Sequence, residues 1–224
     1  MKILDFSLFE KGGPIMWLLL FLSLVGLILF IERTLFLHRS QIRSNEFVSG
    51  IKNILRKRRL VEALTVCEET PGPVANVVKA GLLHHEEDES RMRFAIQEAA
   101  LVEIPAMERR IGSITAIAHV APILGLLGTV LGLINAFYLI QEEGAYAHAG
   151  LLADGVWQAL LTTAAGLAVA VPAYLAQHFL YGRVRALAND MEWVGNDIMA
   201  FLLKDLHSET AVPEYPSGSS ETES

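Results

Sequence analysis

Two threonines, Thr129 and Thr163, stand on the small-residue faces of two long apolar stretches, where few other side chains can do polar chemistry. On a helix, residues that recur three or four positions apart share one face. The two stretches repeat one pattern: the first face is Gly125, Thr129, Gly132 and Ala136, and the second is Ala159, Thr163, Gly166 and Ala170. The repetition predicts two small faces that each present one hydroxyl.

Two uses of such faces are open. Small residues let helix backbones approach closely, so Gly128 and Gly132 favour plain helix packing. Alternatively, the matched hydroxyls line a shared ion passage, or hold another helix whose own polar side chain needs partners. Gln158 and Thr162 lie on a neighbouring strip of the second helix and would line the same passage. Pro172 belongs to the packing face of this helix.

The elements that carry these residues are membrane spans. The chain has 224 residues, of which 52% are hydrophobic. Stretches of about twenty apolar residues can cross a bilayer. Three occur, at 14–32, 111–140 and 155–181. We therefore predict an all-α membrane protein with three transmembrane helices and long helical cytoplasmic extensions.

The orientation follows from the basic residues, which resist translocation near the ends of spans. Lysines and arginines are frequent in residues 33–110, whereas residues 141–154 contain none and hold Glu142 and Glu143. Residues 33–110 and the C-terminus are therefore predicted to be cytoplasmic. The short N-terminal segment 1–13 and the loop 141–154 are predicted to be external.

The cytoplasmic parts are predicted to be helical. One helix is expected to begin near Arg91 and to continue into the second span, because only Pro105 and Pro122 interrupt the pattern. The third span is expected to continue as a helix over 182–207, and the polar residues 208–224 to be disordered. An apolar stripe on that continuation is predicted to pack against other helices: Val184, Leu187, Met191, Val194, Ile198 and Leu202.

Several classes of site are unsupported by the sequence. It has no phosphate-binding loop and no nucleophile elbow, so no enzyme activity and no organic cofactor is predicted. His84 and His85 are adjacent and would point apart on a helix, so no metal site is predicted. Cys67 is interpreted as a small buried hydrophobe. The basic cluster 56–59 is interpreted as a solvated surface that touches anionic lipid, and no nucleic-acid partner is predicted.

The interiors of the three spans hold no Asp, Glu, Lys or Arg. Paths for protons or cations through a membrane usually use an ionisable side chain. If ions pass beside Thr129 and Thr163, a second polypeptide is expected to supply the carboxylate.

Four segments together resemble the ExbB/TolQ branch of the MotA/TolQ/ExbB proton channel family. They are GGPIMWLLLFLSLVGLILFIER (12–33), GPVANVVKAGL (72–82), APILGLLGTVLGLINAF (121–137) and QALLTTAAGLAVAVPAYLAQHF (158–179). The resemblance implies a pentamer of three-span chains in a bacterial inner membrane. It also implies two single-span ExbD/TolR-like subunits that carry the transmembrane aspartate, and a TonB-like or TolA-like effector driven by the proton motive force.

The resemblance also assigns residues. Thr129 and Thr163 match the family's threonines of spans two and three, and would face the pore. Gln158 stands where the family commonly has a glutamate, and because glutamine cannot titrate, the coupling ion is either H⁺ or Na⁺. The process that is energised stays open among TonB-dependent uptake, envelope integrity and motility.

Two other classes of function remain as alternatives. In a passive scaffold, the small faces would only pack helices and no ion would move. A solute transporter would need broken helices and convergent polar groups at mid-membrane, for which Pro122 and Pro172 supply at most the breaks.

Overall fold

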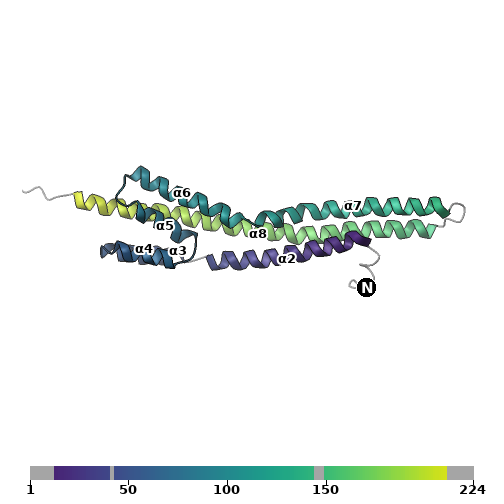
Figure 1. Ribbon diagram of the computed structural model, residues 1–224, viewed down its shortest axis with the longest axis horizontal. Helices are drawn as coiled ribbons and strands as arrows, with labels where there is room; N and C mark the ends of the chain where they lie inside the picture. Colours follow the sequence, from purple (N-terminus) through teal and green to yellow (C-terminus); the bar gives the residue numbers. More distant parts are fainter. Residues whose placement is uncertain (1–12, 41–42, 144–148, 211–224) are drawn as a thin grey trace, which may run out of the picture. The chain divides into compact units, whose positions relative to one another are not determined.

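A computed structural model describes residues 13–40, 43–143 and 149–210, and within these ranges every regular element is a helix (Figure 1). The helices follow the chain in this order: α2 (Gly13–Ser40), α3 (Ser44–Arg56), α4 (Leu60–Glu69), α5 (Pro73–Leu83), α6 (Glu89–Glu108), α7 (Ile111–Glu143) and α8 (Ala149–Thr210). The predicted external segment 1–13, except for Gly13, and the predicted disordered tail beyond Thr210 lie outside the described residues.

The chain divides into two compact units. The first, called here the membrane unit, comprises Met1–Arg39 and Ile104–Ala186, and the second, the extension unit, comprises Ser40–Glu103 and Leu187–Ser224. The membrane unit contains α2, α7 and the first part of α8, and the extension unit contains α3, α4, α5, most of α6 and the last part of α8.

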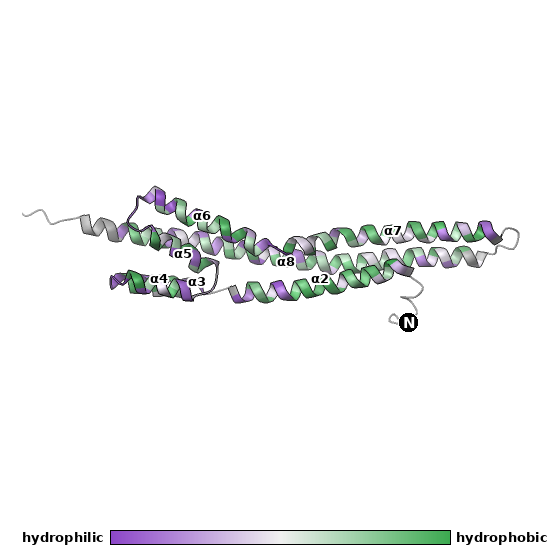
Figure 2. Ribbon diagram, viewed as in Figure 1, coloured by the Kyte–Doolittle hydropathy of each residue, from purple (hydrophilic) through white to green (hydrophobic). Residues whose placement is uncertain are grey.

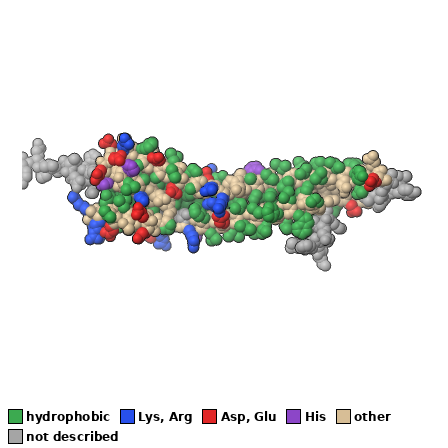
Figure 3. Space-filling view, viewed as in Figure 1, with side chains coloured by type: hydrophobic (Ala, Val, Ile, Leu, Met, Phe, Trp, Pro, Cys, Tyr) green, Lys and Arg blue, Asp and Glu red, His purple; other side chains and the backbone are tan. Residues whose placement is uncertain are grey.

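Among the described residues, three helices are long and apolar enough to cross a bilayer, which confirms the predicted number of candidate spans, and all three contribute to the membrane unit. Figure 2 shows that hydrophobic residues run along α2 and α7. Many large apolar side chains of this unit point outward, as a hydrocarbon environment requires, among them Phe21, Leu24, Ile123, Phe137 and Leu175. The face of this unit seen in Figure 3 is accordingly covered mainly by hydrophobic side chains.

The three helices of the membrane unit pack around small residues. Leu19 of α2, Ala121 of α7 and Ala170 of α8 form one buried cluster. Towards the other end of α2, the rings of Phe30 and Phe179 meet edge to face, with their centroids 6.4 Å apart. Each helix therefore touches the other two.

The expected continuous helix from Arg91 into the second span is interrupted. α6 ends at Glu108 and α7 begins at Ile111, and between them Arg110 has a φ of 89°. A residue with positive φ cannot continue a right-handed helix, and for a non-glycine residue the conformation is rare. The carbonyl oxygen of Arg110 accepts a hydrogen bond from the amide of Ser113 (3.2 Å), which starts the new helix.

The prolines do not break the helices that contain them. Pro122 lies inside α7 and Pro172 inside α8, and α8 is one helix of 62 residues from Ala149 to Thr210. Prolines are tolerated in membrane helices when neighbouring groups compensate for the missing hydrogen bond. Broken helices, which a solute transporter would need, are absent from α7 and α8 as described.

The predicted stripe on the last part of α8 is buried along its whole length, which confirms that it packs against other helices. In the extension unit, Ile96 of α6 lies between Gly81 of α5 and Gly195 of α8. A methyl group added at Gly195 would lie 2.6 Å from the side chain of Ile96. The unit is therefore closed by interdigitated apolar side chains around α8.

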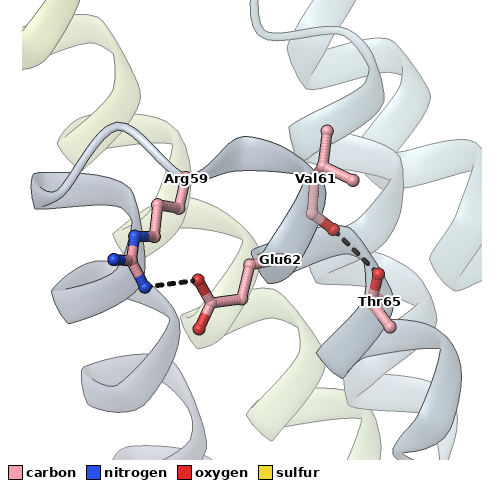
Figure 4. A network of polar contacts seen from close by, with 4 residues as sticks. All are labelled: Arg59, Val61, Glu62 and Thr65. Carbon is pink, nitrogen blue, oxygen red and sulfur yellow. Dashed lines mark hydrogen bonds and ion pairs between the residues drawn. The ribbon is translucent and has the colours of Figure 1, made fainter.

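Polar contacts fix the surface helices of the extension unit. Lys52 of α3 donates a hydrogen bond of 2.6 Å to Asp197 of α8. At the start of α4, Arg59 pairs with Glu62 (3.1 Å), and the hydroxyl of Thr65 donates to the carbonyl of Val61 at 2.9 Å (Figure 4). The Arg59 pair is exposed and contributes little, whereas the half-buried Lys52 pair links α3 to α8.

Cys67 of α4 is a buried residue with 1% of its surface exposed, as its interpretation as a small hydrophobe requires. Burial raises the pKa of its thiol to about 11, and the nearby charge of Lys79 only partly opposes this effect. Because the thiolate is the nucleophile, the folded protein should protect this thiol.

We expect Cys67 to react slowly with iodoacetamide in the folded protein. At pH 8 the raised pKa leaves about a hundredfold less thiolate than an unperturbed cysteine has, and burial adds a steric barrier. Mass spectrometry of the alkylated chain, folded and in denaturant, measures the ratio of rates. Equal rates would show that α4 does not shield the thiol.

The raised pKa of Cys67 also makes the stability of the folded protein depend on pH. The protonated thiol of Cys67 contributes stability that is complete below the pKa of the unfolded chain. This contribution is lost as the pH rises from about 9 to 11.

Candidate functional site

The two threonines singled out by their spacing meet in the structure. The hydroxyl of Thr129 on α7 hydrogen-bonds to the hydroxyl of Thr163 on α8. Thr129 also lies 3.1 Å from the carbonyl oxygen of Ala159, across the interface, and 3.3 Å from that of Gly125 one turn back. Thr163 in turn donates to the carbonyl of Gly125 at 3.3 Å. A cluster of two hydroxyls and two backbone carbonyls therefore joins the two helices.

This cluster forms because the backbones of α7 and α8 approach closely. A methyl group added at Gly166 would lie 2.6 Å from the carbonyl oxygen of Ala121, and one added at Gly125 would lie 3.0 Å from that of Thr162. Real Cβ atoms essentially never approach to 2.6 Å, so position 166 requires glycine, whereas a side chain at position 125 would need the facing backbone to shift by a few tenths of an ångström. The helices are antiparallel, since residues before Thr129 contact residues after Thr163.

The other predicted residues of the small faces lie in the same interface. A methyl group added at Gly128 would lie 2.5 Å from the hydroxyl of Thr162. Thr162 is 1% exposed, and its hydroxyl donates to the carbonyl of Ala159 at 2.8 Å. Gly132 packs against Ala159, where an added methyl group would lie 3.2 Å from the Cβ atom.

Gln158 and Pro172 lie apart from the hydroxyl cluster. The Nε2 atom of Gln158 would be 3.1 Å from a Cβ atom added at Gly13, so this side chain reaches the beginning of α2. Pro172 is exposed on α8 and, together with residues of α2, lines an apolar groove. The structure therefore brings together Thr129, Thr162 and Thr163, and places the polar candidate Gln158 and the packing candidate Pro172 elsewhere in the membrane unit.

The chemistry available to the cluster is that of hydrogen bonding. A threonine hydroxyl has one proton to donate and two lone pairs to accept with, so the half-buried Thr129 and Thr163 keep acceptor capacity beyond the bonds they make. They can accept from water or from a protonated carboxyl group. Neither can hold or release a proton at physiological pH, so any transported proton needs an acid from elsewhere.

Sequence patterns did not single out the buried arginine of the membrane unit. Arg33 is only 6% exposed, and within the described residues its Nε atom has no hydrogen-bond partner. The positive charges of Arg110 and Arg109 lie near Arg33, and the negative charge of Glu32 opposes them. Glu32 itself pairs with Arg110. The sequence feature that could have marked Arg33 is the charged pair Glu32–Arg33, which ends the first span and belongs to the segment 12–33.

Comparison with known proteins places this arrangement in a family. Residues 69–193 match the MotA/TolQ/ExbB proton channel family. The chain is 28% identical over 218 residues to the biopolymer transport protein ExbB of Neisseria meningitidis serogroup A, which covers 89% of this chain and 97% of the relative. Over 88 residues, 39% of this chain and 38% of the relative, it is 39% identical to the Tol-Pal system protein TolQ of Haemophilus influenzae.

An archaeal relative is longer than this chain. The sequence is 29% identical over 179 residues to a homologue of the biopolymer transport protein ExbB from Methanothermobacter thermautotrophicus, and the match covers 80% of this chain and 63% of the relative. The matched family region contains α7 and the part of α8 that carries Thr163. This chain is therefore a membrane protein that belongs to the MotA/TolQ/ExbB proton channel family.

Proposed function

We propose that this chain is the ring-forming subunit of an ion-driven motor channel of the ExbB/TolQ type. It acts with an ExbD/TolR-like single-span subunit whose transmembrane aspartate carries the ion. The movement is passed to a TonB-like or TolA-like effector, which energises transport or envelope processes. The chain has no catalytic residues in this proposal and needs no organic cofactor.

The observation that carries the proposal is the hydroxyl cluster of Thr129 and Thr163 in spans whose interiors have no Asp, Glu, Lys or Arg. A neutral cluster with spare acceptor capacity suits a carboxyl group that is alternately protonated and deprotonated, because it can accept from the acid and can bind water beside the carboxylate. The hydroxyls of Thr129 and Thr163 can thus accept hydrogen bonds from a carboxylic acid that the interiors of these spans lack and that a partner would supply.

The proposed assembly is taken from the resemblance to the family. We propose a homopentamer around a central pore, with two single-span subunits inside it, in a bacterial inner membrane with the N-terminus periplasmic and the C-terminus cytoplasmic. A closed ring needs two different faces on each chain. The large apolar side chains on the outside of the membrane unit, such as Phe137 and Leu160, are available for neighbouring chains and lipid.

The test is ion flux into liposomes that contain this chain with and without its single-span partner, under an imposed potential. Proton uptake is read from a trapped pH-sensitive dye and sodium uptake from a trapped sodium-sensitive dye, in sodium-free and in sodium-containing buffer. We expect flux only when the partner is present. A requirement for sodium would identify Na⁺ as the coupling ion, in keeping with glutamine at position 158.

One observation favours a passive scaffold as the second candidate. The hydroxyls of Thr129 and Thr163 already bond to each other and to the backbone carbonyls of Gly125 and Ala159, so a role in helix packing accounts for the cluster as well. Partner binding demonstrated by co-purification, together with an absence of flux under all ionic conditions, would favour the scaffold and would refute the channel.

A further inference from the structure

An apolar groove of about 480 Å³ runs along the membrane unit, between the second half of α2, the beginning of α7 and the middle of α8. Its walls consist of hydrocarbon side chains and small residues, with Ser23 as the one polar side chain among the lining residues. An occupant without hydrogen-bonding groups is required, since a polar group buried there would lose its partners. Gly26, Ala168 and Ala176 keep the groove open.

Aromatic rings and arginines stand at one end of this groove. Phe30 of α2 and Phe179 of α8 both line it and contact each other. The guanidinium of Arg183 lies over the ring of Phe179, 5.8 Å from its centroid. Arg33 follows Phe30 by one helical turn on α2. Positive charge is thus placed where the apolar walls end.

The buried arginine at this end is only partly compensated, since its guanidinium lies over the ring of Phe36, 4.9 Å from the centroid, without a hydrogen bond at Nε. Arg33 is 94% buried, its Nε atom has no partner among the described residues, and Arg109 and Arg110 add positive charge nearby. Glu32 carries a negative charge beside these arginines, but it already pairs with Arg110. The buried hydroxyl of Thr34, which can donate to a phosphate, likewise has no partner in the described part of the chain. A negative charge at this level would stabilise the cluster.

We propose that the groove and the arginines at its end form a binding site for one anionic phospholipid. One acyl chain lies in the groove, and the phosphate is held by the positive charge of Arg33, Arg109 and Arg183. The headgroup lies at the end of the first span that is predicted to be cytoplasmic, where the anionic lipid of a bilayer meets basic residues. This assignment does not depend on whether ions pass through the protein.

The size and the lining of the groove favour a lipid chain over other occupants. A helix with its side chains is about 10 Å wide, so 480 Å³ would hold only about one turn of it. Free phosphate would satisfy the arginines but would leave the apolar walls empty. A phospholipid has both the charge and the chain, and a bilayer around the three helices would supply it.

The test is native mass spectrometry of the full chain, released from micelles that contain equal amounts of phosphatidylglycerol and phosphatidylcholine. We expect the adduct with phosphatidylglycerol to dominate. Arg33→Gln should reduce that preference about fivefold, since one basic residue near an anionic headgroup contributes about that factor in affinity. Arg33→Lys keeps the charge and should retain most of the preference, whereas Arg39→Gln, at an exposed position of the same helix, should leave it unchanged.

A second pair of variants tests the groove separately. Ala168→Trp should fill it and remove both lipid adducts at this site, whereas Ala164→Trp, one turn earlier on α8 and outside the groove, should not. Glycerol 1-phosphate and inorganic phosphate, added as competitors without acyl chains, should displace little lipid. Equal adducts of the two lipids, or a preference that survives both Arg33→Gln and Ala168→Trp, would overturn the proposal. Efficient displacement by inorganic phosphate would instead identify a simple anion site.

Discussion

Replacing Thr163 with valine is expected to reduce partner-dependent ion flux about tenfold or more. Valine has nearly the shape of threonine, so α7 and α8 should still pack, but the hydroxyl that bonds to Thr129 and to the carbonyl of Gly125 is lost. A hydrogen bond of ordinary strength contributes about 1 kcal/mol, and one that acts on a charged group contributes more. The measurement is dye-monitored proton uptake into liposomes that contain the chain and its partner.

Three further variants complete this experiment. Thr129→Val should have a similar effect, and the double variant should lose little more than either single one, because the two hydroxyls belong to one contact. Thr115→Val is the matched control, since its hydroxyl bonds only to the carbonyl of Ile111 in its own helix among the contacts that the structure shows. Full flux in both Thr129→Val and Thr163→Val would assign the cluster to helix packing alone.

Replacing Gly166 with alanine is expected to lower the stability of the membrane unit by about 1–3 kcal/mol, the usual range for overpacking. The added methyl group would lie 2.6 Å from the carbonyl oxygen of Ala121 and 2.9 Å from the Cα atom of Gly125. Both atoms belong to the backbone of α7, so the helices can avoid the clash only by moving apart. Thermal unfolding in micelles, followed by circular dichroism, measures the effect.

Gly182 provides the control for this substitution on the same helix. A methyl group added there meets nothing within 4 Å. Since alanine is the better helix former by about 0.5–1 kcal/mol, Gly182→Ala should raise the unfolding temperature slightly. If Gly166→Ala behaved like Gly182→Ala, the close approach of α7 and α8 in the described structure would be contradicted.

The number of spans and the continuation of the third span could be predicted from local patterns. Apolar length identifies α2, α7 and α8, and the helical spacing of residues such as Met191 and Ile198 identifies the buried face of the last part of α8. The break at Arg110 could not be predicted in this way. Glycine and proline are the usual signals of a helix end, and here an arginine takes the left-handed conformation.

The contact between Thr129 and Thr163 was only partly predictable. Their spacing placed each threonine on a small face, but whether the two faces meet depends on the rotation and the register of two antiparallel helices, which no single stretch of sequence determines. The burial of Arg33 was also missed. A long basic side chain at the end of a span is expected to extend towards water, whereas this one is covered by its neighbours.

The close contact of α7 and α8 also has a consequence for conformational entropy. Burying a long side chain costs up to about 2 kcal/mol in lost rotamers, whereas glycine and alanine lose none. The interface is built around Gly125, Gly128, Gly132, Ala159 and Gly166, and its threonines are already restricted at χ1. The two helices can therefore associate while very few rotamers become ordered, so even their weak dispersion and hydroxyl contacts are sufficient to hold the pair together.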